Sequence, residues 1–213
     1  MKRYEKILIG GKDKRDEIFD VCLSIGITEE MLDRCSLIFI MQIYGTYMSR
    51  AENPFKIGDE ILHLEGLSRR GQSSTKPATM FDKKVYLKGL WHKHYVGSSV
   101  SDMAINLIGA LRNYGLPKLE ADVNEVMSSG QERYFTPEDA GRIAHEAVVE
   151  NFLRRSQEKR LTGHWIIYAV HEGQNFYLSL GRHNSDEAEI RRNIDAVAVL
   201  EFPFLSEILH PIN

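Results

Sequence analysis

Apolar residues recur at intervals of three and four through the first quarter of the chain, as they do along one face of an amphipathic helix. This periodicity predicts a helix over residues 14–25 and a second helix that begins at Thr28, a favourable N-cap. The middle of the second helix, Leu37–Met41, is apolar on nearly every side, so it belongs in a core or in an oligomer interface. The sequence thus predicts an N-terminal helical pair, which could form a subdomain over residues 1–53.

The pattern weakens over residues 53–83. A short strand is predicted at Glu60–Leu64, and the polar stretch Arg69–Thr79 has the composition of a long surface loop. This loop combines Arg69 and Arg70 with several hydroxyl side chains, which are groups that bind phosphate, but it lacks the ending of a phosphate-binding P-loop. Two interpretations of this segment are therefore open: a solvated surface loop and a phosphate-binding loop.

Helical spacing returns between residues 99 and 158. Ser99 and Thr136 are the predicted N-caps of two long helices, and a shorter helix is expected between them at Lys118–Met127. The stretch Thr136–Asp139 is the clearest boundary in the chain, because proline at the first helical position and acidic residues in the first turn follow the capping hydroxyl. The apolar stripe of the first helix is Met103, Leu107, Ile108 and Leu111, and the predicted buried side of the last is Ala140, Ile143, Ala144, Ala147 and Val148.

Two segments have the two-residue alternation of strands. Within Lys84–Val96, His92 and His94 are two positions apart, so a strand would point both imidazoles to one face. The stretch from His164 to His183 predicts a hairpin with a two-residue turn at Gly173 and Gln174. This register pairs Ala169 with Leu178, Ile167 with Leu180 and Trp165 with Arg182 on one face, and Val170 with Tyr177, Tyr168 with Ser179 and His164 with His183 on the other.

The second hairpin face is polar and aromatic, which favours a surface left open for binding. A final helix is expected from Ser185, and the apolar tail over residues 201–213 should dock on the body or on a partner. We therefore predict an α+β fold in which helices pack on one face of a mainly antiparallel sheet, as a single domain over residues 1–213.

Composition narrows the classes of function. The 213 residues are 43% hydrophobic and 27% charged, and the net charge of −3 excludes a protein that coats nucleic acid through overall positive charge. A local exception is Ser68–Val96, which carries a net charge of +6 and includes His92 and His94. Only two cysteines are present, and there is neither an apolar signal segment nor a stretch of about 20 apolar residues. These features predict a soluble cytoplasmic protein without a membrane partner.

The first functional hypothesis is metal-independent cleavage of a phosphodiester, with single-stranded RNA as the substrate class. Histidine suits this reaction, because its ordinary pKa near 6.5 allows one imidazole to accept a proton while another donates one. The candidate catalytic residues are His92, His94, His164 and His183, and the candidate substrate-binding residues are Arg182, Lys93, Tyr168, Tyr177, Ser179, Arg69 and Arg70.

The second hypothesis is a zinc-dependent hydrolase. Two imidazoles one residue apart on a strand can hold one ion, and His92 and His94 would be joined by His164 or His183, leaving a position open for water. In the first hypothesis no cofactor is needed, whereas here zinc is the cofactor.

The third hypothesis is a non-enzymatic protein that binds another protein as an inhibitor, immunity or adaptor protein. Tyrosine, tryptophan and arginine are common interface anchors, and Trp91, Trp165, Tyr177 and Arg182 are the candidates. A homo-oligomer is a further expectation, with residues 37–48 or the C-terminal tail as the interface.

Overall fold

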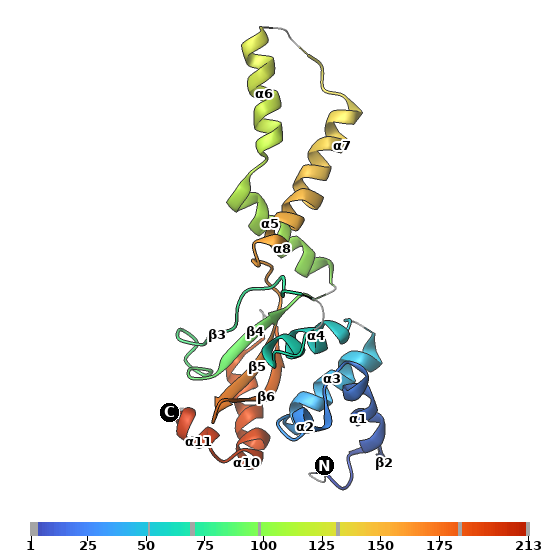
Figure 1. The fold of residues 1–213 in the computed structure, drawn as a ribbon, viewed down its shortest axis with the longest axis vertical. Coiled ribbons are helices and arrows are strands. Elements are labelled where there is room, and N and C mark those ends of the chain that lie inside the picture. The colour runs from blue at the N-terminus through green and yellow to red at the C-terminus, as the bar shows by residue number, and fades with distance from the viewer. Residues whose placement is uncertain are drawn as a thin grey trace.

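The computed structural model describes residues 4–50, 52–68, 71–97, 99–130, 133–182 and 185–211. It confirms the α+β class: a four-stranded antiparallel sheet, in the order β3-β4-β5-β6, is combined with helices (Figure 1). The strands of this sheet are β3 (Thr79–Met80), β4 (Trp91–Tyr95), β5 (His164–His171) and β6 (Gln174–Gly181), and β1 (Leu8–Ile9) and β2 (Lys12–Asp13) form a separate short hairpin.

The N-terminal helices pack on one face of the sheet and form the larger core with it. Their apolar residues meet Tyr95, Ile166, Tyr168 and Tyr177 of the strands. These helices are α1 (Arg15–Ser24), α2 (Glu29–Leu32), α3 (Leu37–Ser49) and α4 (Phe55–Leu64).

Two local expectations in this region were wrong. The strand predicted at Glu60–Leu64 is the end of α4, because Ile57 and Ile61 are one helical turn apart and both are fully buried. The helix that starts after Thr28 is interrupted, and α3 begins anew with the Ser36 hydroxyl accepting a hydrogen bond from the Phe39 backbone nitrogen. A second N-cap thus divides one apolar run into two helices.

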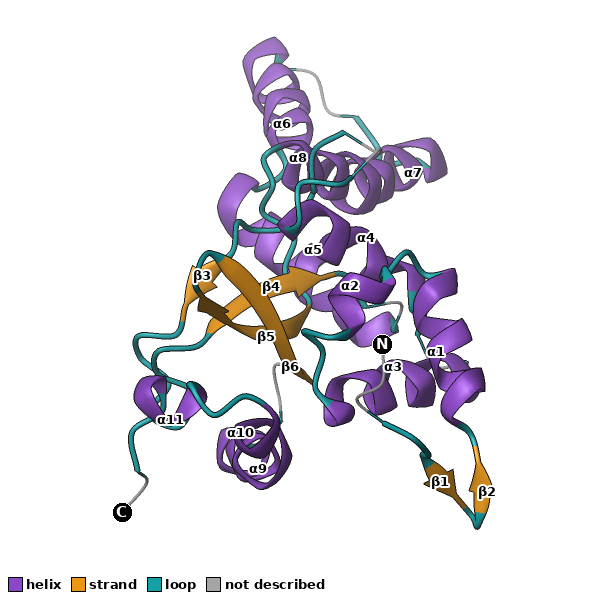
Figure 2. Cartoon of the chain, turned by 60° about the horizontal axis from the view of Figure 1, so that its bottom comes forward, coloured by secondary structure: helices purple, strands orange, loops and turns teal. Residues whose placement is uncertain are grey.

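The C-terminal helices cover the other face of the sheet, as Figure 2 shows from below. They bury Ile167 and Ala169 of β5, and the docking predicted for the tail is confirmed, because Phe202, Leu205 and Leu209 are buried there. The sheet is therefore covered on both faces, including the polar and aromatic face that was predicted to be open. These helices are α9 (Glu187–Asn193), the π-helix η2 (Ile194–Ala198), α10 (Val199–Glu201) and α11 (Leu205–Ile208).

The predicted hairpin exists, but its turn and register differ from the expectation. The two turn residues are Glu172 and Gly173, with φ of 49° and 77°, as a type I′ turn requires. A register shift beside Ile167 then changes the pairing again along the strands. The observed partners include Trp165 with Gly181, Ile167 with Ser179, Tyr168 with Tyr177 and His171 with Gln174.

The outer edge of β6 is closed by the N-terminal layer. The Ser36 nitrogen donates to the Tyr177 carbonyl oxygen at 2.8 Å, and the Leu180 nitrogen donates to Gln42 Oε1 at 2.6 Å. These bonds satisfy backbone groups that an exposed edge strand would leave free, so this edge does not offer a strand-pairing surface.

A helical segment is inserted between β4 and β5 and projects from the sheet (Figure 1). We call residues 99–158 the arm and the remainder the body. The predicted N-caps of its long helices are confirmed: Ser99 and Thr136 each accept a hydrogen bond from the backbone nitrogen three residues on. The arm consists of α5 (Val100–Tyr114), α6 (Pro117–Ser129), α7 (Pro137–His145), the π-helix η1 (Glu146–Glu150) and α8 (Asn151–Gln157).

Candidate functional site

His92 and His94 do share a face of β4, with ring centroids 5.2 Å apart. That face packs against the C-terminal core. The His92 ring stacks on Phe81 at 4.3 Å, and His94 is 5% exposed, with Nδ1 3.0 Å from the Gly163 carbonyl oxygen. Both rings are thus part of the packing between β4 and its neighbours.

His164 lies on the opposite face of the sheet, because it pairs with Tyr95, whereas His94 pairs with Trp165. The expected convergence of His164 with His92 and His94 is therefore wrong. The alternation of side chains along antiparallel strands separates them, and the register could not be obtained from the sequence pattern alone.

His164 has two carboxylates as neighbours. Its Nε2 lies 3.2 Å from Glu52 Oε1 and 3.4 Å from Asp102 Oδ2, and all three side chains are less than a tenth exposed. Hydrogen bonding to His164 holds the pKa of Glu52 below its ordinary value, and Arg182 Nη2 donates to Glu52 Oε1 at 2.9 Å. Two carboxylates beside the imidazole oppose the approach of a phosphate group.

Lys93 does not lie free to bind phosphate. Its Nζ is 3.1 Å from Glu60 Oε2 and donates to Ser73 Oγ at 2.9 Å, to Thr75 Oγ1 at 2.5 Å and to a backbone carbonyl. Burial lowers the pKa of Lys93, although Glu60 acts in the opposite direction. This cation fastens the loop after α4 to the sheet.

The tyrosines expected on an open face are buried in the N-terminal core. Tyr168 is 3% exposed, and burial raises its pKa to about 12. Tyr177 is fully buried, and its hydroxyl donates to Glu65 Oε1 at 2.6 Å. Ser179 is 1% exposed, with its hydroxyl near Gln42. The prediction of an open face was wrong, because tyrosine and serine are easily buried once a neighbouring element supplies a hydrogen-bond partner.

The remaining predicted site residues, Arg69, Arg70 and His183, lie outside the described residues. Within the described ranges, no group of three or more His, Cys, Asp and Glu side chains is arranged to hold a metal ion. The zinc hypothesis, with His183 as a ligand beside His92 and His94, therefore stays a prediction without a described third ligand.

Part of the expected oligomer surface at residues 37–48 is interior, whereas Tyr47 and Met48 at its end are 46% and 55% exposed. Phe39, Ile40 and Ile43 of α3 are at most 1% exposed, and the C-terminal tail packs on the body. The homo-oligomer through this segment stays a prediction, and a larger surface for a partner lies elsewhere.

The arm offers such a surface, because its polarity is inverted: many of its large apolar side chains are exposed, and most of its buried side chains are polar. About a quarter of the chain forms the arm, yet it holds 11 of the 21 exposed large hydrophobic side chains among the described residues. Apart from Ala110, its buried residues are Asp102, Asn106, Asp139, Glu146, Asn151 and Arg155.

This inversion corrects the predicted faces of the arm helices. Met103 and Ile108, from the apolar stripe of α5, are 55% and 48% exposed, and Val148 is 44% exposed. The interior is polar because its groups bond to backbone: Asn106 binds Thr162, and Glu146 accepts from the nitrogens of Lys118 and Leu119. Hydrogen bonds therefore hold the arm together, and its apolar side chains point outward.

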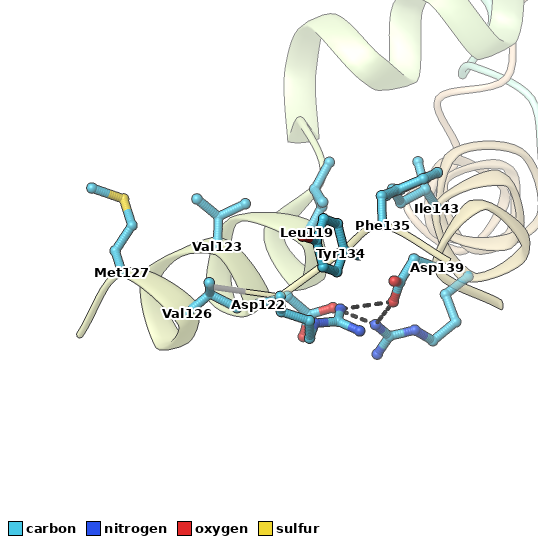
Figure 3. Close-up of a pocket in the computed structure, with 11 residues that line it drawn as sticks. Leu119, Asp122, Val123, Val126, Met127, Tyr134, Phe135, Asp139 and Ile143 are labelled. Atoms are coloured by element: carbon cyan, nitrogen blue, oxygen red, sulfur yellow. Dashed lines mark hydrogen bonds and ion pairs between the residues drawn. The ribbon is translucent and has the colours of Figure 1, made fainter. Parts of the chain in front are cut away.

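The outward apolar residues gather at two places. One groove runs along α5 and the helix formed by η1 and α8. A second hollow, of about 220 Å³, lies between α6 and α7 (Figure 3). The groove is lined by Val100, Met103, Ala104, Leu107, Val148, Val149, Phe152 and Leu153, and the apolar lining of the hollow is Leu119, Val123, Val126, Met127, Tyr134, Phe135 and Ile143.

An ion-pair network borders the hollow and joins its two helices. Arg133 and Arg142 donate to Asp139 Oδ1 at 2.8 and 2.7 Å, and Arg142 also reaches Asp122 on α6 at 3.0 Å. In Figure 3, dashed lines mark the interactions of the Asp139 carboxylate beside the hollow. These arginines, Arg133 foremost, hold the pKa of Asp139 well below its ordinary value. Charged groups thus join the helices at the rim while the apolar floor stays accessible.

Comparison with protein-family models, curated proteins and solved structures found no match to this chain. Within the described ranges, the structure contains no helix that is both long enough and apolar enough to cross a membrane. The geometry of the chain is therefore the basis for any functional assignment.

Sequence reasoning missed both the carboxylates around His164 and the inverted arm. Asp102 follows the predicted N-cap Ser99 by three residues, which is a local relation that does not point to His164, and Glu52 has no local signal. The arm did have a signal: Asp102, Asn106, Gly109 and Ala110 form an alternative small and polar stripe on α5. Apolar periodicity alone could not show which stripe faces inward.

Proposed function

We propose that this chain is a protein-binding module and that the arm is its binding element. The observation that supports the proposal most directly is the inverted polarity of the arm. Exposed apolar patches that exceed ordinary surface scatter are typical of interaction sites. The apolar hollow between α6 and α7 has a charged rim, which is the usual composition of a protein interface.

Phosphodiester cleavage is less well supported by the geometry. The reaction needs two imidazoles and a cation around one phosphate, whereas His164 and His94 lie on opposite faces of the sheet. Lys93 is held by Glu60, and Arg182 is held by Glu52. A protein-binding function requires none of these groups to converge.

Site-specific photocrosslinking tests the proposal. A photoreactive residue at Met127, which is 77% exposed beside the hollow, should give a discrete crosslinked adduct in the cells that produce the chain. The matched control is the same residue at Ser128, exposed on the polar side of α6. Adduct formation at Met127 should fall strongly in a Val123→Asp variant, because a charge would enter the apolar face.

Two results would contradict the proposal. Equal adducts at Met127 and Ser128 would mean that the apolar face has no preferred partner. RNA cleavage by the purified chain that is lost in His92→Ala, His94→Ala and His164→Ala variants of unchanged circular dichroism would establish the enzymatic alternative instead.

A further inference from the structure

Polar side chains join the arm to the body. Neither apolar core of the body includes a described residue of the arm, which projects away from both cores (Figure 1). Where the two parts meet, Asn106 of α5 exchanges hydrogen bonds with the backbone of Thr162, and Asp102 of α5 lies beside His164 at the start of β5. The orientation of the arm is therefore not fixed by a shared apolar core.

His164 links the arm to a second part of the body. Its Nε2 lies 3.4 Å from Asp102 of the arm and 3.2 Å from Glu52, in the loop that joins α3 to α4. Both carboxylates thus lie against the same nitrogen, while Nδ1 has no hydrogen-bond partner among the described residues. Because one N–H group cannot bond fully to two carboxylates, this geometry favours attraction between opposite charges. We call Glu52, His164 and Asp102 the latch.

The backbone at Gly97 packs directly against the latch. A Cβ added there would stand 2.0 Å from Asp102 Oδ2 and 3.0 Å from His164 Nε2, so a larger residue does not fit. Gly97 is itself buried, and the three latch side chains are less than a tenth exposed. Water therefore has little access to the two carboxylates, and protein groups must supply the opposite charge.

The charges around His164 are balanced only when its ring is protonated. The other described charged groups here are the carboxylates of Glu52 and Asp102 and the guanidinium of Arg182, which donates to Glu52 at 2.9 Å. The Tyr95 hydroxyl donates to Glu52, and burial raises the pKa of Tyr95, so this group stays neutral. An imidazolium gives two positive and two negative charges, whereas a neutral imidazole leaves one buried carboxylate without a cation.

We propose that the latch is a pH-sensitive switch that sets the orientation of the arm relative to the body. Histidine is the side chain whose charge ordinarily changes between pH 5 and pH 8. At the acid end of this range, the imidazolium attracts both carboxylates and holds α5 against the loop after α3. As the pH rises and the imidazole loses its proton, the two carboxylates repel each other and the arm is released.

This inference goes beyond the proposed protein-binding function and does not require it, because the switch is a property of the purified chain. The sign follows from the charges of the partners. Carboxylates stabilise the protonated form of a histidine, so the contribution of the latch is present at low pH and is lost as the pH rises. Failure of the switch would leave the binding surface of the arm unaffected as a proposal.

Double electron–electron resonance between the arm and the body tests the inference. Spin labels at Ala144→Cys on α7 and Asp20→Cys on α1 occupy exposed positions, and the native Cys22 and Cys35 are buried. Between pH 5.5 and pH 8, the population with a displaced arm should rise about tenfold or more, because a buried ion pair is lost. His164→Gln keeps a hydrogen-bond donor but cannot carry the charge, so the displaced arm should predominate at both pH values.

His145→Gln is the matched control, because it removes an exposed histidine within the arm. This variant should keep the pH response of the wild type. Wild-type distances that are the same at pH 5.5 and pH 8 would overturn the inference. A pH response that persists in His164→Gln would do so as well.

Gly97→Ala tests the latch with His164 still in place. The added methyl group must push Asp102 away from His164, so the displaced arm should predominate at both pH values. Gly141→Ala on α7 is its control, because nothing lies within 4 Å of a Cβ added there, and it should respond to pH as the wild type does. A wild-type response in Gly97→Ala would count against the latch.

Nuclear magnetic resonance of the wild-type chain keeps the test decisive if these variants do not fold. The ring resonances of His164 and the population with a displaced arm should change with the same midpoint pH. Different midpoints, or a His164 ring that does not titrate while the arm moves, would assign the movement to another group and overturn the inference.

Discussion

At the scale of single residues, the most informative correction concerns the histidines. Spacing alone showed that His92 and His94 share a face, because that relation is local to one strand. The surroundings of His164 depend on Glu52 and Asp102, which lie 112 and 62 positions away in the sequence, and no local pattern brings them together. Helix caps such as Thr136 were predictable for the same reason, because the backbone nitrogen that donates to the capping side chain is only three residues away.

The Glu52–His164 pair should make stability depend on pH in the acid range. The pKa of Glu52 is lowered in the folded protein, so its contribution is present above the ordinary value of 4.5 and is lost as the pH falls through the folded value. We expect Glu52→Gln to lower the melting temperature at pH 7 by about 2–4 °C. The melting temperature of the variant should also fall less than that of the wild type between pH 5 and pH 3.

Thermal unfolding followed by circular dichroism at several pH values measures this effect. Glu125→Gln changes an exposed carboxylate on α6 and is the control, with a pH profile that should match the wild type. An identical acid profile for Glu52→Gln and wild type would show that Glu52 does not contribute.

At the scale of elements, the N-terminal helices depend on one close crossing. Gly58 of α4 lies against the end of α1, where an added Cβ would stand 1.9 Å from the Ile25 carbonyl oxygen. We expect Gly58→Ala to destabilise the protein by about 1–3 kcal/mol, because backbone must move apart to admit the methyl group. Denaturant unfolding of the purified chain gives this difference in free energy.

Gly45→Ala is the matched control in the same helical layer. Nothing lies within 4 Å of a Cβ added at Gly45, so the change should stabilise α3 by about 0.5–1 kcal/mol through helix propensity. Similar effects of the two substitutions would contradict the close crossing.

Sequence patterns predicted elements well where one face is plainly apolar. The hairpin β5–β6 and the final helix were found, although the register of the hairpin was not, because Glu172–Gly173 and Gly173–Gln174 are both acceptable turns. In the arm, α5 has an apolar stripe and a polar stripe, and only tertiary hydrogen bonds such as that from Asn106 to Thr162 decide which is interior. The α+β class could therefore be predicted, but the faces could not.

At the scale of the whole molecule, the arm and the body have different requirements. Both large apolar cores belong to the body, and Tyr95 and His164 at the two ends of the insertion are paired across adjacent strands. We expect that replacing residues 99–160 with a short glycine-rich turn will leave a folded, cooperatively melting body with lower helix content. Circular dichroism and calorimetry measure both properties, and loss of cooperative unfolding would show that the body needs the arm.

The position of the arm between β4 and β5 also affects how the chain reaches this fold. Pairing of Tyr95 with His164 closes a segment of more than 60 residues, and such non-local closure carries an entropic cost that slows folding. Helices joined by short connections form on a much faster timescale. If the arm forms first, its helices bring the two ends of the insertion close before the strands meet, so the early partly folded chain already displays the apolar surface of the arm. Association between chains would then compete with closure of the sheet, and refolding yield should fall as the protein concentration rises.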